Sequence, residues 1–126
     1  MAANKKILVV DDEPDIVTYL STLFADQGYE VVTAADGEGA VRTARAEKPD
    51  LITLDMSMPG QSGVRALAEL KADDVLKKIP VIIVTGIGEP MKSFLDRMKK
   101  APTAEGFISK PIEEAELLGL AKKLTA

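Results

Sequence analysis

Short apolar runs that end abruptly in polar residues limit most strongly what this chain can fold into. The clearest is residues 51–54, which lead directly into Asp55 and then into Met58-Pro59. A short apolar run bounded by turn-forming residues indicates a buried strand. Three other runs have the same form, namely residues 6–10 before Asp11-Asp12, residues 81–84 before Thr85, and residues 106–109 before Lys110-Pro111.

Segments with helical spacing of apolar residues separate these runs. The spacing of one helix face is found over residues 14–27 and again over residues 113–123. Residues 30–34 indicate a further strand, and Glu89-Pro90 is typical of a helix start. Strand-like runs that alternate with helical segments are typical of βα units around a parallel sheet. The sequence therefore predicts an α/β fold built from five βα units.

The length and composition exclude several classes of function. The 126 residues suffice for one domain, which we expect to span residues 1–126 without a separate output domain. The apolar runs are too short for a transmembrane helix or for the core of a signal peptide, so we expect a cytoplasmic protein without membrane contact. The chain has no cysteine or histidine, which excludes disulfides and both thiolate and imidazole metal ligands. Its net charge of −4 argues against nucleic-acid binding.

Chemically useful side chains follow four of the predicted strands. Because the carboxyl ends of parallel strands meet at one edge of a sheet, Asp11, Asp12 and Asp55 are expected there together with Thr85 and Lys110. Three crowded carboxylates oppose one another's ionisation, and one lysine does not balance them. A hard divalent cation does, and magnesium, which takes oxygen ligands and keeps several waters, fits better than calcium.

This set of residues also suits phosphoryl transfer. A carboxylate beside magnesium can attack a phosphoryl group and form an acyl phosphate. Lys110 can neutralise the phosphoryl oxygens, and the Thr85 hydroxyl can donate to one of them. Taken singly, each residue has an ordinary structural explanation, since acidic residues after strands cap helices or form turns and most lysines lie on the surface. The combination from four strand ends is what indicates a site.

At these residues the chain resembles the receiver domain of bacterial two-component response regulators, including the single-domain chemotaxis type. The resemblance covers residues 6 to 124 approximately, and it implies a flavodoxin-like, doubly wound sheet of five parallel strands in the order 2-1-3-4-5, flanked by five helices. The matching residues are Asp11-Asp12, Asp55, Met58-Pro59, Gly63, Thr85, Phe107 and Lys110-Pro111.

The resemblance also implies roles for the acidic residues. Asp55 is implied to be the phosphoacceptor. Asp12, Asp55 and the backbone carbonyl of Ser57 are implied to bind Mg²⁺ directly, and Asp11 through water. Lys110 is implied to contact the phosphoryl group, and the peptide bond that joins it to Pro111 is expected to be cis, which is uncommon for X-Pro bonds in general.

The function implied is a phosphorylation-dependent signalling switch in a two-component phosphorelay. The phosphoryl group would come from a phosphohistidine of a sensor histidine kinase or a phosphotransfer protein, because this chain contains no histidine. The chain would catalyse its own phosphorylation and dephosphorylation without being an enzyme toward other substrates. Thr85 and Phe107 resemble the switch pair. An output protein that the sequence does not identify would bind the face formed by the fourth helix, the fifth strand and the last helix.

Two other functions are compatible with a parallel sheet of this kind. A magnesium-dependent aspartyl-phosphate phosphohydrolase of the haloacid dehalogenase type needs a second aspartate two residues after the nucleophile, where this chain has Ser57. A flavodoxin-like flavin-binding module needs a phosphate-binding loop after the first strand, and here that loop is Asp11-Asp12-Glu13, which repels phosphate.

Overall fold

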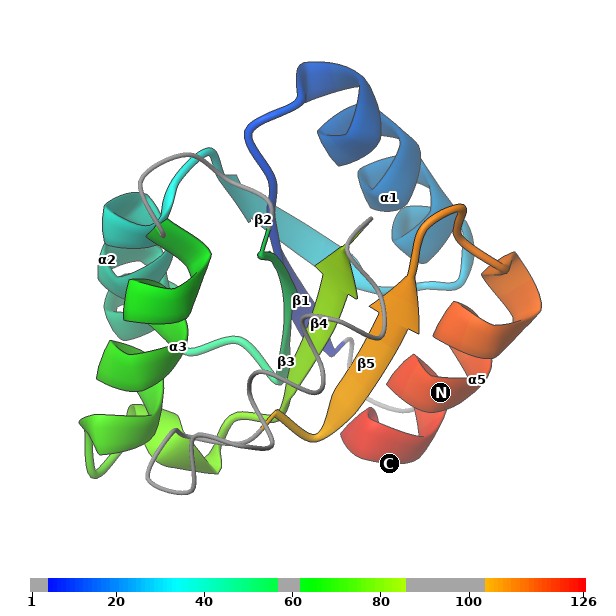
Figure 1. Ribbon diagram of the computed structural model, residues 1–126. Coiled ribbons are helices and arrows are strands. Elements are labelled where there is room, and N and C mark those ends of the chain that lie inside the picture. The colour runs from blue at the N-terminus through cyan, green and yellow to red at the C-terminus, as the bar shows by residue number, and fades with distance from the viewer. Residues whose placement is uncertain (1–4, 57–61, 86–103) are drawn as a thin grey trace.

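Figure 1 shows the computed structural model, a parallel sheet with helices on both faces. The structure describes residues 5–56, 62–85 and 104–126. Its five strands are β1 (Lys6–Val10), β2 (Glu30–Ala34), β3 (Leu51–Asp55), β4 (Val81–Thr85) and β5 (Gly106–Ser109). They lie in the order β2-β1-β3-β4-β5, and every neighbouring pair is parallel. The predicted strands and the implied strand order are therefore confirmed.

The described helices follow strands, as the alternating pattern predicts. They are α1 (Pro14–Asp26), α2 (Gly37–Glu47), α3 (Ser62–Ala72) and α5 (Glu114–Thr125), with the short 3₁₀ helix η2 (Leu76–Lys78) between α3 and β4. Four α-helices are thus described, whereas five were predicted. The helix expected to begin at Glu89-Pro90 lies outside the described residues.

The two faces of the sheet bury two separate apolar clusters. Side chains that alternate along the strands pack on α1 and α5 on one face, and on α2 and α3 on the other (Figure 1). All five residues of the central strand β3 are consequently buried, as is typical of a parallel strand covered on both sides. The strand therefore holds its last residue, Asp55, in a fixed place.

The start of α3 lies directly on the end of β3. A Cβ atom added to Gly63 would come within 2.6 Å of the Asp55 carbonyl oxygen and 3.0 Å of the Met56 Cα atom. Both are backbone atoms of a buried segment, so neither can move aside easily. Only glycine allows α3 to approach the residue that ends β3 this closely.

We predict that Gly63→Ala lowers the free energy of unfolding by about 1–3 kcal/mol, because the new methyl group displaces either α3 or the end of β3. Gly119→Ala is the matched control, since no atom lies within 4 Å of a Cβ placed there and the position is exposed on α5. It should raise the free energy of unfolding by about 0.5–1 kcal/mol, the usual gain from alanine in a helix. Chemical denaturation measures both, and a Gly63→Ala variant as stable as the parent would contradict the close approach.

Candidate functional site

Three aspartates meet where β1 and β3 end. The two strands are neighbours, with Val10 paired to Leu54, so the residues that follow lie side by side. Asp11 and Asp55 are each only 2% exposed, whereas Asp12 is exposed. One carboxylate oxygen from each of the three lies within 4.8 Å of the others. The predicted gathering of these carboxylates is therefore present.

Lys110, which follows the edge strand β5, brings a positive charge to the same place. Its Nζ atom lies 3.5 Å from Oδ2 of Asp11 and 3.9 Å from Oδ1 of Asp55. The side chain is 20% exposed, so the ammonium is held between the acidic residues and solvent. The peptide bond between Lys110 and Pro111 is cis, which confirms the expectation from the resemblance.

Burial dominates the electrostatics of Asp11. It raises the pKa of this carboxyl group, and the nearby Asp55 carboxylate raises the same pKa further. The N–H of Glu13, which donates to Oδ1 of Asp11 at 2.9 Å, and the Lys110 ammonium both act to lower it. Ionised Asp11 is therefore only partly compensated by its neighbours, as expected for a carboxylate that a bound cation would stabilise.

The start of α1 supplies a contact that the sequence analysis missed. Oε1 of Glu13 lies 3.9 Å from Nζ of Lys110, so the loop after β1 approaches the lysine from a third side. The sequence indicated Glu13 only as part of the acidic loop after the first strand, and in the structure it is the N-cap residue of α1 without a side-chain hydrogen bond to the helix. Local spacing could not reveal the contact, because Glu13 follows β1 and Lys110 follows β5, and β3 and β4 lie between these two strands in the sheet.

The two residues expected to form a switch lie on neighbouring strands. Phe107 is half-buried on β5, packs against the α2 and α3 side of the core, and is paired with Ile83 of β4. β4 ends two residues later at Thr85, whose backbone pairs with Ser109. The strand end at Thr85 is thus adjacent to the strand that carries Phe107 and leads into Lys110. Ser57, the remaining predicted site residue, lies outside the described residues.

A cavity of about 290 Å³ opens beside the acidic cluster, between the start of α1 and the end of β2. Asp11 and Asp12 line it on one side, and its other walls are mostly small or apolar. The other lining residues are Pro14, Val17, Thr18, Thr33, Ala34 and Ala35. Asp11 and Asp12 therefore border an open space.

The arrangement suits cation binding and phosphoryl chemistry. Hard oxygen ligands converge within a few ångströms, and a lysine stands beside the buried carboxylate of Asp55. These are the groups that bind Mg²⁺ and balance the charge of a phosphoryl group. No helix within the described ranges is long and apolar enough to cross a bilayer.

The chain is similar in sequence to proteins of known name. The chain is 35% identical over 113 residues to the protein PilH of Pseudomonas aeruginosa, and the match covers 90% of this chain and 91% of PilH. It is 38% identical over 114 residues to the alkaline phosphatase synthesis transcriptional regulatory protein PhoP of Bacillus subtilis. That match covers 90% of this chain but 45% of PhoP, so the chain spans about half the length of this relative.

A solved structure and a family model identify the family to which the chain belongs. The receiver domain of the sensor histidine kinase PA1611 from Pseudomonas aeruginosa PAO1, solved with a magnesium ion coordinated in its active-site cleft, is 28% identical with a TM-score of 0.82. The match covers 98% of this chain and 100% of that one. The family model of the response regulator receiver domain matches residues 7–122. The chain therefore belongs to the response regulator receiver domain family of two-component signalling.

Proposed function

We infer that the chain is a signalling switch that accepts a phosphoryl group on Asp55 from a phosphohistidine of a sensor histidine kinase or a phosphotransfer protein. Receiver domains interact with proteins of these two kinds and with output domains. The observation that carries the proposal is the position of Asp55 at the end of β3, with Lys110 Nζ 3.9 Å from its Oδ1 and two further carboxylates beside it.

The donor set fits Mg²⁺, the cation that receiver domains bind at an acidic pocket. Asp11, Asp12 and Asp55, together with the backbone carbonyl of Ser57, are the residues that would hold it. Bound there, the cation neutralises the carboxylates and offsets the negative charge of the phosphoryl oxygens. Two of the three aspartates are buried, with Lys110 as the cation that pairs with them among the described residues, which supports a binding site over a solvated acidic surface.

The transfer step needs only groups that the chain and its donor possess. A carboxylate oxygen of Asp55 attacks the phosphorus atom, a P–O bond forms, and the P–N bond to the donor imidazole breaks. The electron pair of that bond stays on the imidazole nitrogen. Lys110 balances the charge that the arriving phosphoryl oxygens bring to the buried end of β3. Water later attacks the phosphorus atom, the P–O bond to Asp55 breaks, and inorganic phosphate leaves with the Asp55 carboxylate regenerated. In this proposal the chain catalyses both its own phosphorylation and its own dephosphorylation.

The two alternatives weighed from the sequence gain no support. Of the relatives named above, PhoP is a transcriptional regulatory protein and the PA1611 structure is a receiver domain, and none of the three is a phosphohydrolase or a flavin carrier by name. The loop at Asp11-Asp12-Glu13 also keeps three acidic side chains beside the first strand, two of them exposed, which disfavours a flavin phosphate there.

Incubation of the protein with a small phosphodonor and Mg²⁺ tests the acceptor. The intact mass of the parent should increase by one phosphoryl group, and the mass of Asp55→Asn should not change, because the amide is not a nucleophile of comparable strength. Asp26→Asn, an exposed aspartate at the end of α1, is the matched control and should be phosphorylated like the parent. An equal mass gain in Asp55→Asn would show that Asp55 is not the acceptor.

Removal of one carboxylate tests the magnesium site. Asp12→Asn should weaken Mg²⁺ binding at least about tenfold, because a charged oxygen ligand is lost. Without the metal the same variant should be more stable than the parent by about 1 kcal/mol, since repulsion among the carboxylates is relieved. Calorimetric titration and chemical denaturation measure the two effects. Unchanged affinity for Mg²⁺ in Asp12→Asn would argue against the site.

We further propose that phosphorylation alters the face at which the output partner binds. Within the described residues this face comprises β5 and α5, and the fourth helix expected from the sequence lies outside them. A phosphoryl group on Asp55 attracts the Thr85 hydroxyl, and Phe107 turns into the space that Thr85 vacates. Moving such a switch from 1:99 to 99:1 needs about 5.5 kcal/mol. One hydrogen bond to a charged group contributes about 1.5–3 kcal/mol, so Lys110 must supply part of the difference.

Amide chemical shifts with and without a phosphoryl mimic such as beryllofluoride test this output face. Shifts should extend from the residues around Asp55 to Phe107 and into α5, which lies beside β5. Asp55→Asn with the same mimic is the control and should show no such spread. Changes confined to the ends of β1 and β3 would rule out the proposed face.

A further inference from the structure

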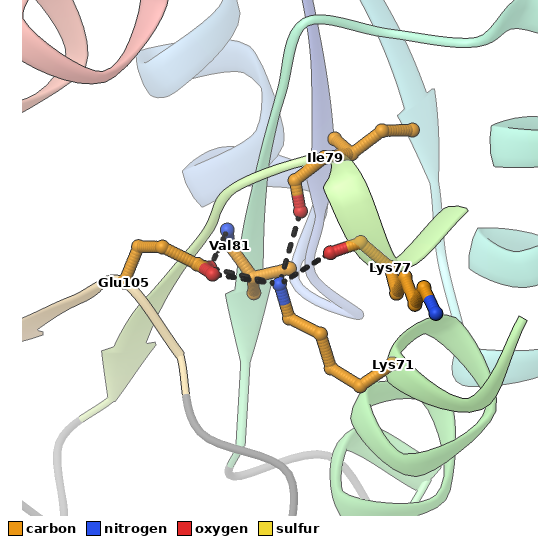
Figure 2. Close-up of polar contacts among 5 residues, drawn as sticks. All are labelled: Lys71, Lys77, Ile79, Val81 and Glu105. Carbon is orange, nitrogen blue, oxygen red and sulfur yellow. Dashed lines mark hydrogen bonds and ion pairs between the residues drawn. The ribbon is translucent and has the colours of Figure 1, made fainter. Parts of the chain in front are cut away.

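A second polar cluster lies at the opposite end of β4 and β5 from the acidic site (Figure 2). Lys71, in the last turn of α3, has a side chain that is only 10% exposed. Its Nζ atom donates to both carboxylate oxygens of Glu105 at 2.9 Å. It also donates to the carbonyl oxygens of Lys77 at 3.4 Å and Ile79 at 3.1 Å. One ammonium therefore joins α3, η2, the segment that enters β4, and the residue that precedes β5.

Glu105 extends the pairing of β4 with β5 by one residue. Its backbone N–H donates to the carbonyl oxygen of Val81 at 2.9 Å, and its Oε1 accepts from the N–H of Val81 at 2.8 Å. The next pair along is Ile82 with Gly106, where the regular ladder begins. Val81 is fully buried, so its N–H would be costly to leave without an acceptor. The carboxylate of Glu105 thus performs the role of a strand carbonyl at the start of β4.

The start of β5 needs an additional interaction to fix its register on β4, because the strand is short and lies at the edge of the sheet. It has four residues and pairs only with β4 in the described strand order. Phe107 packs on the apolar cluster of one face of the sheet and Ile108 on that of the other, so the alternation of side chains along β5 does not by itself fix the register. A displacement by one residue moves the following chain by about 3.3 Å.

Lys110 is the residue that such a displacement would affect. It comes directly after β5, and its Nζ lies 3.5 Å from Asp11 and 3.9 Å from Asp55. These distances leave little tolerance for movement of the strand along its axis. The register of β5 on β4 therefore determines how far the Lys110 ammonium lies from the two carboxylates.

We propose that Lys71 and Glu105 form a register lock that places Lys110 beside Asp55, which makes both of them positioning residues for phosphoryl transfer. Glu105 makes the hydrogen bond that sets the register. Its side chain is 39% exposed, and without the Lys71 ammonium the carboxylate would gain by turning toward water and releasing Val81. The proposal rests on the proposed function in one respect, namely that Lys110 assists transfer to Asp55.

Four variants separate this role from ordinary stabilisation. Lys71→Met removes the ammonium, and Glu105→Ala removes the acceptor for Val81. Glu105→Gln keeps an oxygen that can accept from Val81, so it is the conservative variant that should preserve the lock. Lys6→Met is the matched control. Lys6 pairs with Glu47 at 2.8 Å and with Glu30 at 3.8 Å at the start of β1. Like Lys71 it lies where the strands begin, but β3 and β4 separate β1 from β5.

The rate of mass gain with a small phosphodonor and Mg²⁺ is measured at a temperature at which every variant is fully folded. Lys71→Met and Glu105→Ala should each lower the rate about tenfold or more, since small misplacements of catalytic groups are this costly. Glu105→Gln and Lys6→Met should keep the rate within about twofold of the parent, even if they lower the unfolding temperature. Parent-like rates for both Lys71→Met and Glu105→Ala would overturn the lock.

A double-mutant cycle shows whether the effect passes through Lys110. In a Lys110→Ala background, Lys71→Met should have no further effect on the rate, because the group that it positions is already absent. A full additional loss there would overturn the proposal in favour of general disruption. Amide shifts of Ile108 and Lys110 should also move in Lys71→Met and stay in place in Lys6→Met. A parent that gains no phosphoryl group would refute the proposed function instead, and the amide shifts alone would then decide the lock.

Discussion

The carboxylates of Asp11 and Asp55 are almost completely buried side by side at the ends of neighbouring strands, and the free-energy cost of this burial must be offset by the rest of the fold. Burying a charge is unfavourable unless it is paired, and Lys110 compensates Asp11 and Asp55 only in part. The cost is offset elsewhere, by a central strand that is buried along its whole length and by apolar clusters on both faces of the sheet. The carboxylates at the ends of β1 and β3 therefore repel one another, and a bound cation would relieve that repulsion.

Much of this architecture could be predicted because the signals are local. Each strand is a short apolar run that can be recognised from neighbouring residues alone. The run that ends at Asp55 is mostly apolar without alternation, as expected for a strand that the structure buries on both faces. The meeting of Asp11, Asp12 and Asp55 follows from parallel pairing once β1 and β3 are neighbours, since adjacent parallel strands bring the residues after them together. The strand order and the cis bond before Pro111 came from the family resemblance and were confirmed by the structure.

Contacts that depend on packing between distant segments were not predictable in the same way. No helix or strand was predicted from Asp73 to Lys78, but this segment contains η2, and Oδ1 of Asp73 accepts hydrogen bonds from the N–H groups of Val75 and Leu76. The ion pair of Lys71 with Glu105 joins residues 34 positions apart. It exists only because α3 ends against the entry to β4, and neither residue has a spacing or a motif that would indicate this.

The helix α3 is anchored at both of its ends, and this makes its length a fixed quantity. At one end, Gly63 packs on the backbone of Asp55, and at the other, Lys71 holds Glu105. Insertion of a single residue between them would turn Lys71 by about 100° around the helix axis and shift it by about 1.5 Å. Homologous chains that keep both contacts must therefore have the same number of residues from Gly63 to Lys71, even where the outward side chains of the helix differ freely.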